Sequence, residues 1–63
     1  MIDISEYWGA EGRRSKILMD TDGTYVVDCF SAESLQKRIV LNGKSIYFAE
    51  DTAENWVDGI IKE

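Results

Sequence analysis

Histidine is absent from this 63-residue sequence, and cysteine occurs only once, at Cys29. The lack of histidine removes the commonest general base and the commonest metal ligand of proteins. A single cysteine cannot close a disulfide within the chain, although small secreted domains usually depend on several. We therefore expect a protein that is not an enzyme, that holds no cofactor or metal, and that resides in a reducing cytoplasm.

Basic residues and long apolar runs are also scarce. Seven Lys and Arg residues stand against twelve Asp and Glu residues, and the resulting net charge of −5 disfavours binding to phosphate backbones. No apolar run approaches the ~20 residues that span a bilayer, and the first residues lack the basic and apolar regions of a signal peptide. Nucleic acid is therefore disfavoured as a partner, and no membrane partner is expected.

The chain is nevertheless rich enough in core-forming residues to fold. Hydrophobic residues make up 44% of it, among them two tryptophans, three tyrosines and two phenylalanines. This composition excludes a disordered chain. Because 63 residues have room for only one hydrophobic core, residues 1–63 are expected to form a single domain.

Two runs rich in β-branched, aliphatic and aromatic residues, 15–20 and 24–30, flank the turn-forming pair Asp22-Gly23. This pattern predicts a β-hairpin with a two-residue turn. Such a turn would pair Leu18 with Val27 across the two strands. Both faces of the hairpin would then carry apolar side chains.

A third strand is expected from the β-branched pair within residues 37–41, after a polar loop at 31–36. Residues 15–41 would then form a three-stranded antiparallel sheet. The preceding segment, 1–14, is expected to be an N-terminal arm, or a short strand followed by a glycine-containing loop.

The C-terminal third of the chain predicts a helix over 45–61. Ser45 suits the N-cap position, and apolar residues recur after it at helical spacing up to Ile60. The pair Asn42-Gly43 leaves residues 44–48 open as a fourth strand or as the start of the helix, and we favour the helix. The expected fold class is α+β: a three-stranded antiparallel hairpin sheet packed against one C-terminal α-helix.

One helix can cover only one face of such a sheet. The second, partly apolar face then favours a homodimer. Cys29 lies among apolar strand residues, so we expect a buried structural cysteine rather than a reactive thiol.

The acidic residues of the predicted helix are candidates for binding a partner. Glu50, Glu54 and Asp58 are spaced at i, i+4 and i+8, so they line one helix face, where like charges repel one another. A solvated face explains them without function, whereas an acidic docking surface or a DNA-mimicking stripe gives them one. Tyr7 and Trp8 of the N-terminal segment are the candidate aromatic anchors of the same interface, and packing in the core is the other explanation of Trp8.

A basic sheet surface is the alternative site. Its candidate residues are Arg13, Arg14, Lys16, Lys37 and Arg38. If these cations shared one face they could bind nucleic acid, and otherwise they serve to protect strand edges and ends. The arrangement of a three-stranded sheet plus a helix is similar to the arm-type DNA-binding domains of phage integrases, from which this acidic chain departs.

The segments DGTYVVD (22–28) and YFAEDTAENWVDGI (47–60) resemble small uncharacterised proteins of tailed bacteriophages, especially T4-like phages of marine cyanobacteria. The likeness covers roughly residues 15–61 and includes no catalytic residue. It implies an accessory protein made in the cytoplasm of an infected bacterium. The function expected on this basis is to bind and modulate a host protein.

Overall fold

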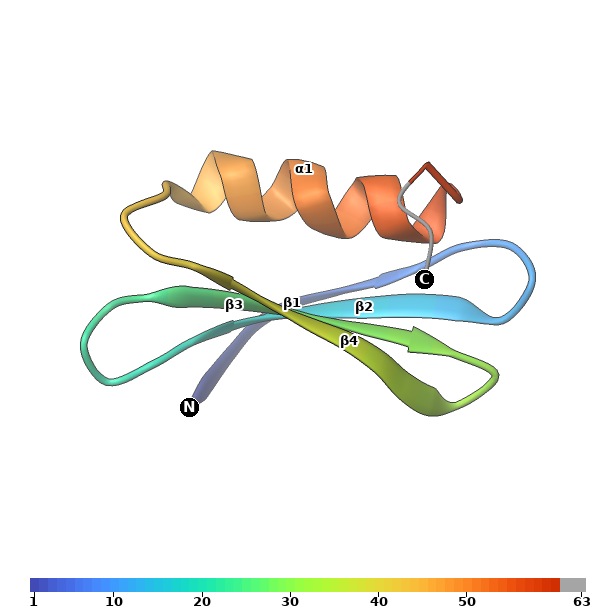
Figure 1. Ribbon diagram of the computed structural model, residues 1–63, viewed down its shortest axis with the longest axis horizontal. Coiled ribbons are helices and arrows are strands. Elements are labelled where there is room, and N and C mark those ends of the chain that lie inside the picture. Colours follow the sequence, from blue (N-terminus) through green and yellow to red (C-terminus); the bar gives the residue numbers. More distant parts are fainter. Residues whose placement is uncertain (61–63) are drawn as a thin grey trace.

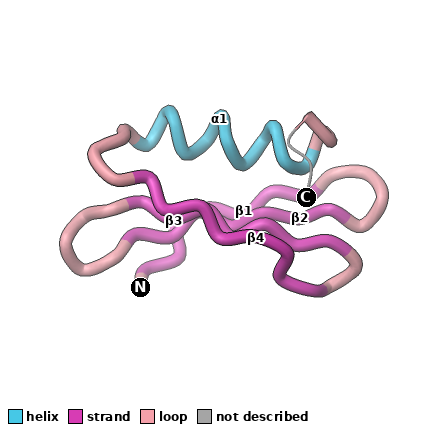
Figure 2. Tube along the Cα trace, in the orientation of Figure 1, coloured by secondary structure: helices cyan, strands magenta, loops and turns pink. Residues whose placement is uncertain are grey.

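The computed structural model describes residues 1–60, which form one antiparallel sheet and one helix. The strands follow one another in space in the order of the sequence, and the helix lies across one face of the sheet (Figures 1 and 2). The predicted α+β class with one C-terminal helix is confirmed, but the sheet has four strands and not three. The elements are β1 (Ile2–Trp8), β2 (Arg13–Met19), β3 (Tyr25–Ser31), β4 (Ser34–Leu41) and α1 (Ile46–Val57).

The additional strand is β1, which the sequence left open as an arm or a short strand. It pairs with β2 along its length, from Ile2 opposite Met19 to Trp8 opposite Arg14, with a shift in register between Asp3 and Ser5. This irregularity displaces the two-residue alternation of side chains that identifies a strand. The pattern of apolar residues in this segment is therefore a poor match to a regular strand.

The turn between β2 and β3 has three residues, 21–23, and not the predicted two. The N–H of Gly23 donates to the carbonyl of Asp20, and the N–H of Asp20 donates to the carbonyl of Thr24. Gly23 has a φ of 88°, as expected when a type I turn is closed by a left-handed residue. Leu18 therefore pairs with Val26, and the predicted pairing with Val27 is wrong by one residue.

The predicted loop at 31–36 is also wrong, because β3 and β4 are joined by a two-residue turn. Its residues, Ala32 and Glu33, have φ values of 53° and 67°, the left-handed pair of a type I′ hairpin turn. Neither residue is the Asn or Gly that usually marks such a turn. An irregularity after Cys29 then places Leu35 opposite Phe30.

Helix α1 begins and ends at recognisable caps. The Ser45 hydroxyl oxygen accepts the N–H of Phe48, which confirms the predicted N-cap and resolves 44–48 as the start of the helix. The helix ends at Val57, before its predicted end at 61. Gly59 (φ 80°) donates to the carbonyl of Trp56, and Ile60 donates to that of Asn55, which is the Schellman arrangement. Residue 61 lies outside the described residues.

The hydrophobic core lies between the helix and the sheet. Trp56 is its largest buried side chain, and its indole N–H donates to the carbonyl of Phe30 at 2.9 Å. Ser15 is also buried, and its hydroxyl donates to the carbonyl of Ala53 at 3.0 Å. These bonds fix the helix to β2 and β3 and satisfy the polar atoms within the core. The core residues are Ile17, Val27, Cys29, Leu41, Ala49, Ala53, Trp56 and Val57.

Candidate protein-binding face

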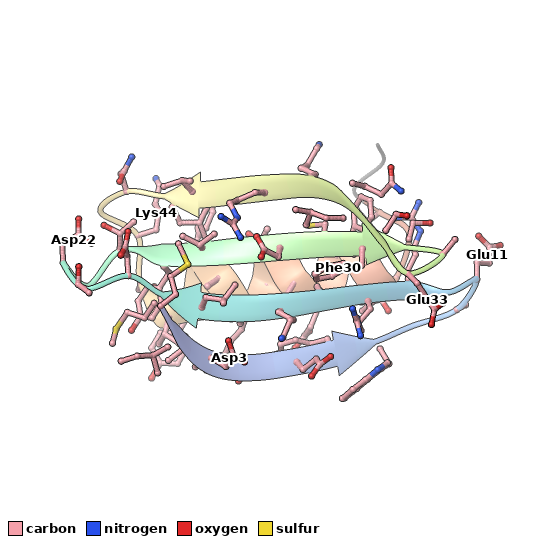
Figure 3. All side chains as sticks on the ribbon, turned by 90° about the horizontal axis from the view of Figure 1, so that it is seen from below. Asp3, Glu11, Asp22, Phe30, Glu33 and Lys44 are labelled. Carbon is pink, nitrogen blue, oxygen red and sulfur yellow. The ribbon has the colours of Figure 1, made fainter. Side chains whose placement is uncertain are left out.

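The sheet face opposite the helix is not covered by any described element, and we call it the open face (Figure 3). Strand pairing aligns its side chains in three rows that run across the four strands. Each row takes one residue from each strand, in the order β1 to β4. The rows are the aromatic row (Trp8, Arg14, Phe30, Leu35), the charge row (Glu6, Lys16, Asp28, Arg38) and the aliphatic row (Asp3, Leu18, Val26, Val40).

Charges alternate in sign along the charge row, from Glu6 through Lys16 and Asp28 to Arg38. Asp28 is only 6% exposed and accepts two hydrogen bonds from the Arg38 guanidinium, at 2.6 and 2.8 Å. A bidentate hydrogen bond of this kind fixes the orientation of both side chains. These hydrogen bonds, followed by the charge of Asp28, raise the pKa of Arg38.

The remaining charges of the open face are paired with neighbours in adjacent rows. Lys16 Nζ lies 3.5 Å from Asp3 Oδ2, and Arg14 Nη1 lies 3.6 Å from Glu6 Oε2. The open face thus carries three cations and three carboxylates. Because it is neutral, the net charge of −5 of the whole chain resides elsewhere.

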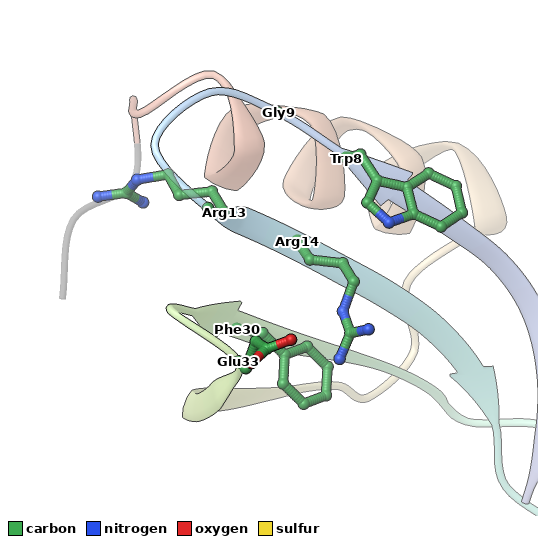
Figure 4. A pocket seen from close by; sticks show the side chains of 7 residues that line it. Trp8, Gly9, Arg13, Arg14, Phe30 and Glu33 are labelled. Carbon is green, nitrogen blue, oxygen red and sulfur yellow. The ribbon is translucent and has the colours of Figure 1, made fainter.

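Trp8, Arg14 and Phe30 of the aromatic row line a hollow at one end of the sheet (Figure 4). Arg14 lies over the Phe30 ring, with its guanidinium carbon 4.5 Å from the ring centre. Trp8 forms another wall and is 69% exposed, and Glu33 completes the rim. A cation held over an aromatic ring beside an exposed tryptophan is a combination typical of protein-binding sites.

Two tight turns hold this end of the sheet together. The N–H of Ala32, in the β3–β4 turn, donates to the carbonyl of Gly12, in the β1–β2 turn, at 3.3 Å. Glu11, Ala32 and Glu33 all have positive φ, a conformation that is costly for residues with a Cβ atom. The bond between the turns ties the β1–β2 and β3–β4 connections together, and the pairing of Trp8 and Phe30 with Arg14 places these two residues on either side of β2.

The two predicted aromatic anchors point to opposite sides of the sheet. Trp8 lies on the open face, whereas Tyr7 packs against the core on the helix side. Burial raises the pKa of Tyr7, and the negative charges of Glu50 and Glu54 raise it further. The structure therefore brings Tyr7 to the acidic side of the helix and separates it from Trp8.

The predicted acidic residues lie along the helix. Glu50 and Glu54 belong to α1, and Asp58 is its C-cap. Glu54 and Asp58 are exposed and Glu50 is partly buried beside Tyr7. No Lys or Arg occurs within α1, so this acidic surface is distinct from the neutral open face.

The five cations of the basic alternative do not share a face. Arg14, Lys16 and Arg38 lie on the open face, where each is paired with a carboxylate. Arg13 lies on the helix side, where it donates to the carbonyl of Trp56 and stacks over its ring at 4.4 Å. Lys37 pairs with Cys29 in the register of the helix side. The observed arrangement therefore does not create a continuous basic surface for phosphates.

Cys29 is buried in the core, as the sequence predicts, and burial raises the pKa of its thiol to about 11. We expect the native protein to be inert to thiol reagents at pH 8 and to react fully once urea unfolds it. The contribution of this thiol to the free energy of unfolding should be constant below pH ~9 and should be lost as the pH rises towards ~11, because only the unfolded thiol ionises in this window.

Urea titrations of the wild type and of Cys29→Ala between pH 8 and pH 11 test this expectation. The variant should lose stability less steeply with pH, and the raised pKa of Tyr7 accounts for a further decline at higher pH that both proteins share. Equal slopes for the two proteins would contradict a thiol kept protonated by the fold.

Several residues of the open face were not among the predicted site residues, notably Glu6, Phe30 and Leu35. A signal for them exists in the sequence, because Gly23 suits the left-handed position of a three-residue hairpin loop. With that loop, the register places Phe30 beside Arg14. With the predicted two-residue turn, the register would differ by one residue. The β3 residues on the same face as Arg14 would then be those that in fact lie on the helix side.

Among residues 1–60, no group of three or more His, Cys, Asp and Glu side chains is arranged to hold a metal ion, and the helix is too short and too polar to cross a membrane. Searches of known protein families, of curated proteins and of solved structures found no match to this chain.

Proposed function

We propose that this protein is a non-enzymatic protein-binding module that docks through the open face of its sheet. The observation that carries the proposal is a sheet face that no described element covers and that presents exposed apolar side chains. Trp8, Leu35 and Val40 are 69%, 51% and 53% exposed, respectively. Exposed apolar side chains that share a surface with ordered polar groups are typical of interfaces.

The polar groups of this face support the same function. Asp28 and Arg38 already hold one another in a fixed geometry, so little side-chain entropy remains to be lost when a partner covers them. Arg14 is ordered in the same way over the Phe30 ring. Arginine and aromatic residues are also the types that most often dominate binding energy at protein interfaces.

The finer part of the proposal concerns origin and partner. The resemblance to small proteins of T4-like phages supports a phage-encoded accessory protein that acts in the host cytoplasm and modulates a host protein. The acidic helix surface of Glu50, Glu54 and Asp58 suits a basic patch on such a host protein, since complementary charge steers association. This surface is on the other side of the molecule from the open face.

A site-specific photo-cross-linker tests where protein partners bind. We would place the cross-linking side chain at Leu35 on the open face, at Glu54 on the acidic surface and, as a control, at Asp22 in the exposed β2–β3 turn. After irradiation in bacterial cells and with the purified protein, we expect adducts of defined mass at Leu35 and none at Asp22. Adducts at Glu54 with a host protein would support the finer proposal.

The absence of a specific adduct at Leu35 would contradict the proposed function. If Leu35 yields no adduct, or only the diffuse adducts that Asp22 also yields, the open face does not dock a protein. Circular dichroism of each labelled protein provides the folding control, because all three positions are exposed.

A further inference from the structure

We infer that the protein docked on the open face is a second copy of this chain, packed face to face about a two-fold axis that runs parallel to the strands. The inference rests on the proposed function of the open face and names its partner. It follows from the order of charges in the charge row, which reads minus, plus, minus, plus from β1 to β4.

A two-fold axis parallel to the strands, centred between β2 and β3, reverses the order of the strands in the second copy. Glu6 then faces Arg38 of the second copy, and Lys16 faces Asp28 of the second copy. The other two contacts repeat these by symmetry. Every position of the charge row thus meets a charge of opposite sign.

The alternative two-fold axis lies in the plane of the interface, perpendicular to the strands, and passes through the charge row. It brings like charges together. It keeps the order of the strands, so Glu6 faces Glu6 of the second copy and Lys16 faces Lys16. Like charges brought together at an interface suppress that arrangement. The alternating charges therefore favour the axis parallel to the strands and disfavour the axis perpendicular to them.

The other two rows agree with the same axis. In the aromatic row, Trp8 faces Leu35 of the second copy, and Arg14, at the floor of the hollow, faces the other Phe30 ring. In the aliphatic row, Leu18 faces Val26 of the second copy, but both side chains are already buried within one chain, at 9% and 2% exposed, so this pair adds little contact area. Asp3 meets Val40 only at the outer edge, where the Asp3 side chain is 66% exposed to water.

The size and net charge of the face are compatible with a reversible dimer. Two sheets can pack face to face about 10 Å apart with their strands inclined by about 30°. A two-fold axis that is close to parallel to the strands, tilted from them by about 15°, produces this angle and still reverses the order of the strands. The molecule measures 33 × 18 × 17 Å, so two open faces bury on the order of 1,200 Å², the lower end of specific interfaces. Because the open face is neutral, the repulsion between two chains of charge −5 comes from residues outside the contact and is weakened by added salt.

Thiol cross-linking tests the axis without breaking an ion pair. Trp8→Cys and Leu35→Cys each replace an exposed residue of the aromatic row, and Cys29 is buried. Within one chain the two positions are three strand spacings, or about 14 Å, apart. A short bismaleimide should join the two variants when they are mixed and should leave each variant alone largely uncoupled. Coupling of Trp8→Cys to itself, or no coupling in the mixture, would overturn the inference.

Charge exchange provides an independent measurement. Glu6→Arg and Arg38→Glu should each raise the dimer dissociation constant tenfold or more in sedimentation equilibrium, because each places like charges in contact. An equimolar mixture should form a heterodimer of twice 7.2 kDa, since the two changes complement one another across the interface. Glu54→Arg makes the same change of charge as Glu6→Arg, but on the helix, and should leave the dimer intact.

Circular dichroism must first show that each variant is folded, because Arg38→Glu places a second carboxylate beside buried Asp28. If it fails to fold, the cysteine pair decides the question. A wild type that stays at 7.2 kDa at millimolar concentration overturns the inference. If Leu35 then cross-links only to a different protein, the proposed function stands without the dimer, whereas the absence of any adduct removes both.

Discussion

Replacing Trp56 by alanine is expected to leave the protein largely unfolded at 25 °C. The side chain is the largest in the core and has no exposed surface. Truncating a buried tryptophan typically costs about 3–5 kcal/mol, and a domain of this size has a total stability of the same order. Far-ultraviolet circular dichroism should show the loss of structure directly. A folded Trp56→Ala protein with a cooperative melt near that of the wild type would contradict this account of the core.

Trp56→Phe separates the hydrogen bond of the indole from its volume. The phenylalanine ring retains much of the packing, but the carbonyl of Phe30 loses the donor that lies 2.9 Å away. We expect a destabilisation of about 1–3 kcal/mol, as for a buried acceptor left without its partner. Trp8→Ala is the matched control, since its side chain is mostly exposed and should change stability by less than about 0.5 kcal/mol.

This tryptophan also connects the core to the open face. Its indole holds the backbone of Phe30, and its ring and carbonyl hold Arg13 on the side of the sheet opposite Arg14. Because Phe30 and Arg14 form the hollow, a weakened core should loosen the aromatic row as well. Measurements of binding on Trp56 variants therefore need a stability control.

The helix was the element best predicted from the sequence, because its signals are local. A serine N-cap and apolar residues at helical spacing indicated α1, and Ser45 does cap it. Its end was placed too late because the apolar pattern continues to Ile60. Gly59 ends the helix by adopting a left-handed conformation, after which Ile60 is 68% exposed.

The sheet was harder to predict because register depends on turns. The β2–β3 turn has one residue more than the sequence predicts, and the register shifts accordingly. Val27 pairs with Ile17 in the core, and Val26 pairs with Leu18 on the open face. The β3–β4 turn uses Ala32 and Glu33 in a conformation that composition alone would assign to Asn and Gly. Turn chemistry of this kind is determined by the paired strands on either side and leaves a weak local signal.

The candidate site was predicted in part for the same reason. The sequence leaves Trp8 open as a core residue or an exposed anchor, and the structure rules out the core, because Trp8 is 69% exposed on the open face. Tyr7 was grouped with it by sequence proximity, although adjacent residues of a strand point to opposite faces. The charge row could not be identified without the register, because its four residues come from four different strands.

The two surfaces described above are compatible in one assembly. In a dimer formed through the open faces, each helix lies on the outside. The helices that carry Glu50, Glu54 and Asp58 then form the two outer layers of the dimer. Such a particle could engage two basic sites at once, which strengthens binding when both are within reach. The proposed dimerisation through one face and the proposed host binding through the other would therefore be separable by mutation.

Gly9→Ala is expected to be the most damaging change of a single small residue in this chain. An added Cβ would overlap the carbonyl oxygen of Val57 and would lie 2.6 Å from the Val57 Cβ. The backbone of Gly9 therefore approaches the end of α1 more closely than a side chain permits. Overpacking of this kind costs about 3 kcal/mol, which in a domain of this size corresponds to a fall in Tm of more than ~12 °C.

Two comparisons identify the cause. Gly43→Ala introduces the same methyl group where nothing lies within 4 Å, so only its left-handed φ of 71° is penalised, by about 1 kcal/mol. Adding Val57→Ala to Gly9→Ala should not restore stability, because the nearest atom is the backbone oxygen, which every residue carries. Thermal melts of the three proteins distinguish these effects. Full rescue by Val57→Ala would show that side-chain crowding, and not the approach of helix and strand backbones, makes glycine necessary between β1 and β2.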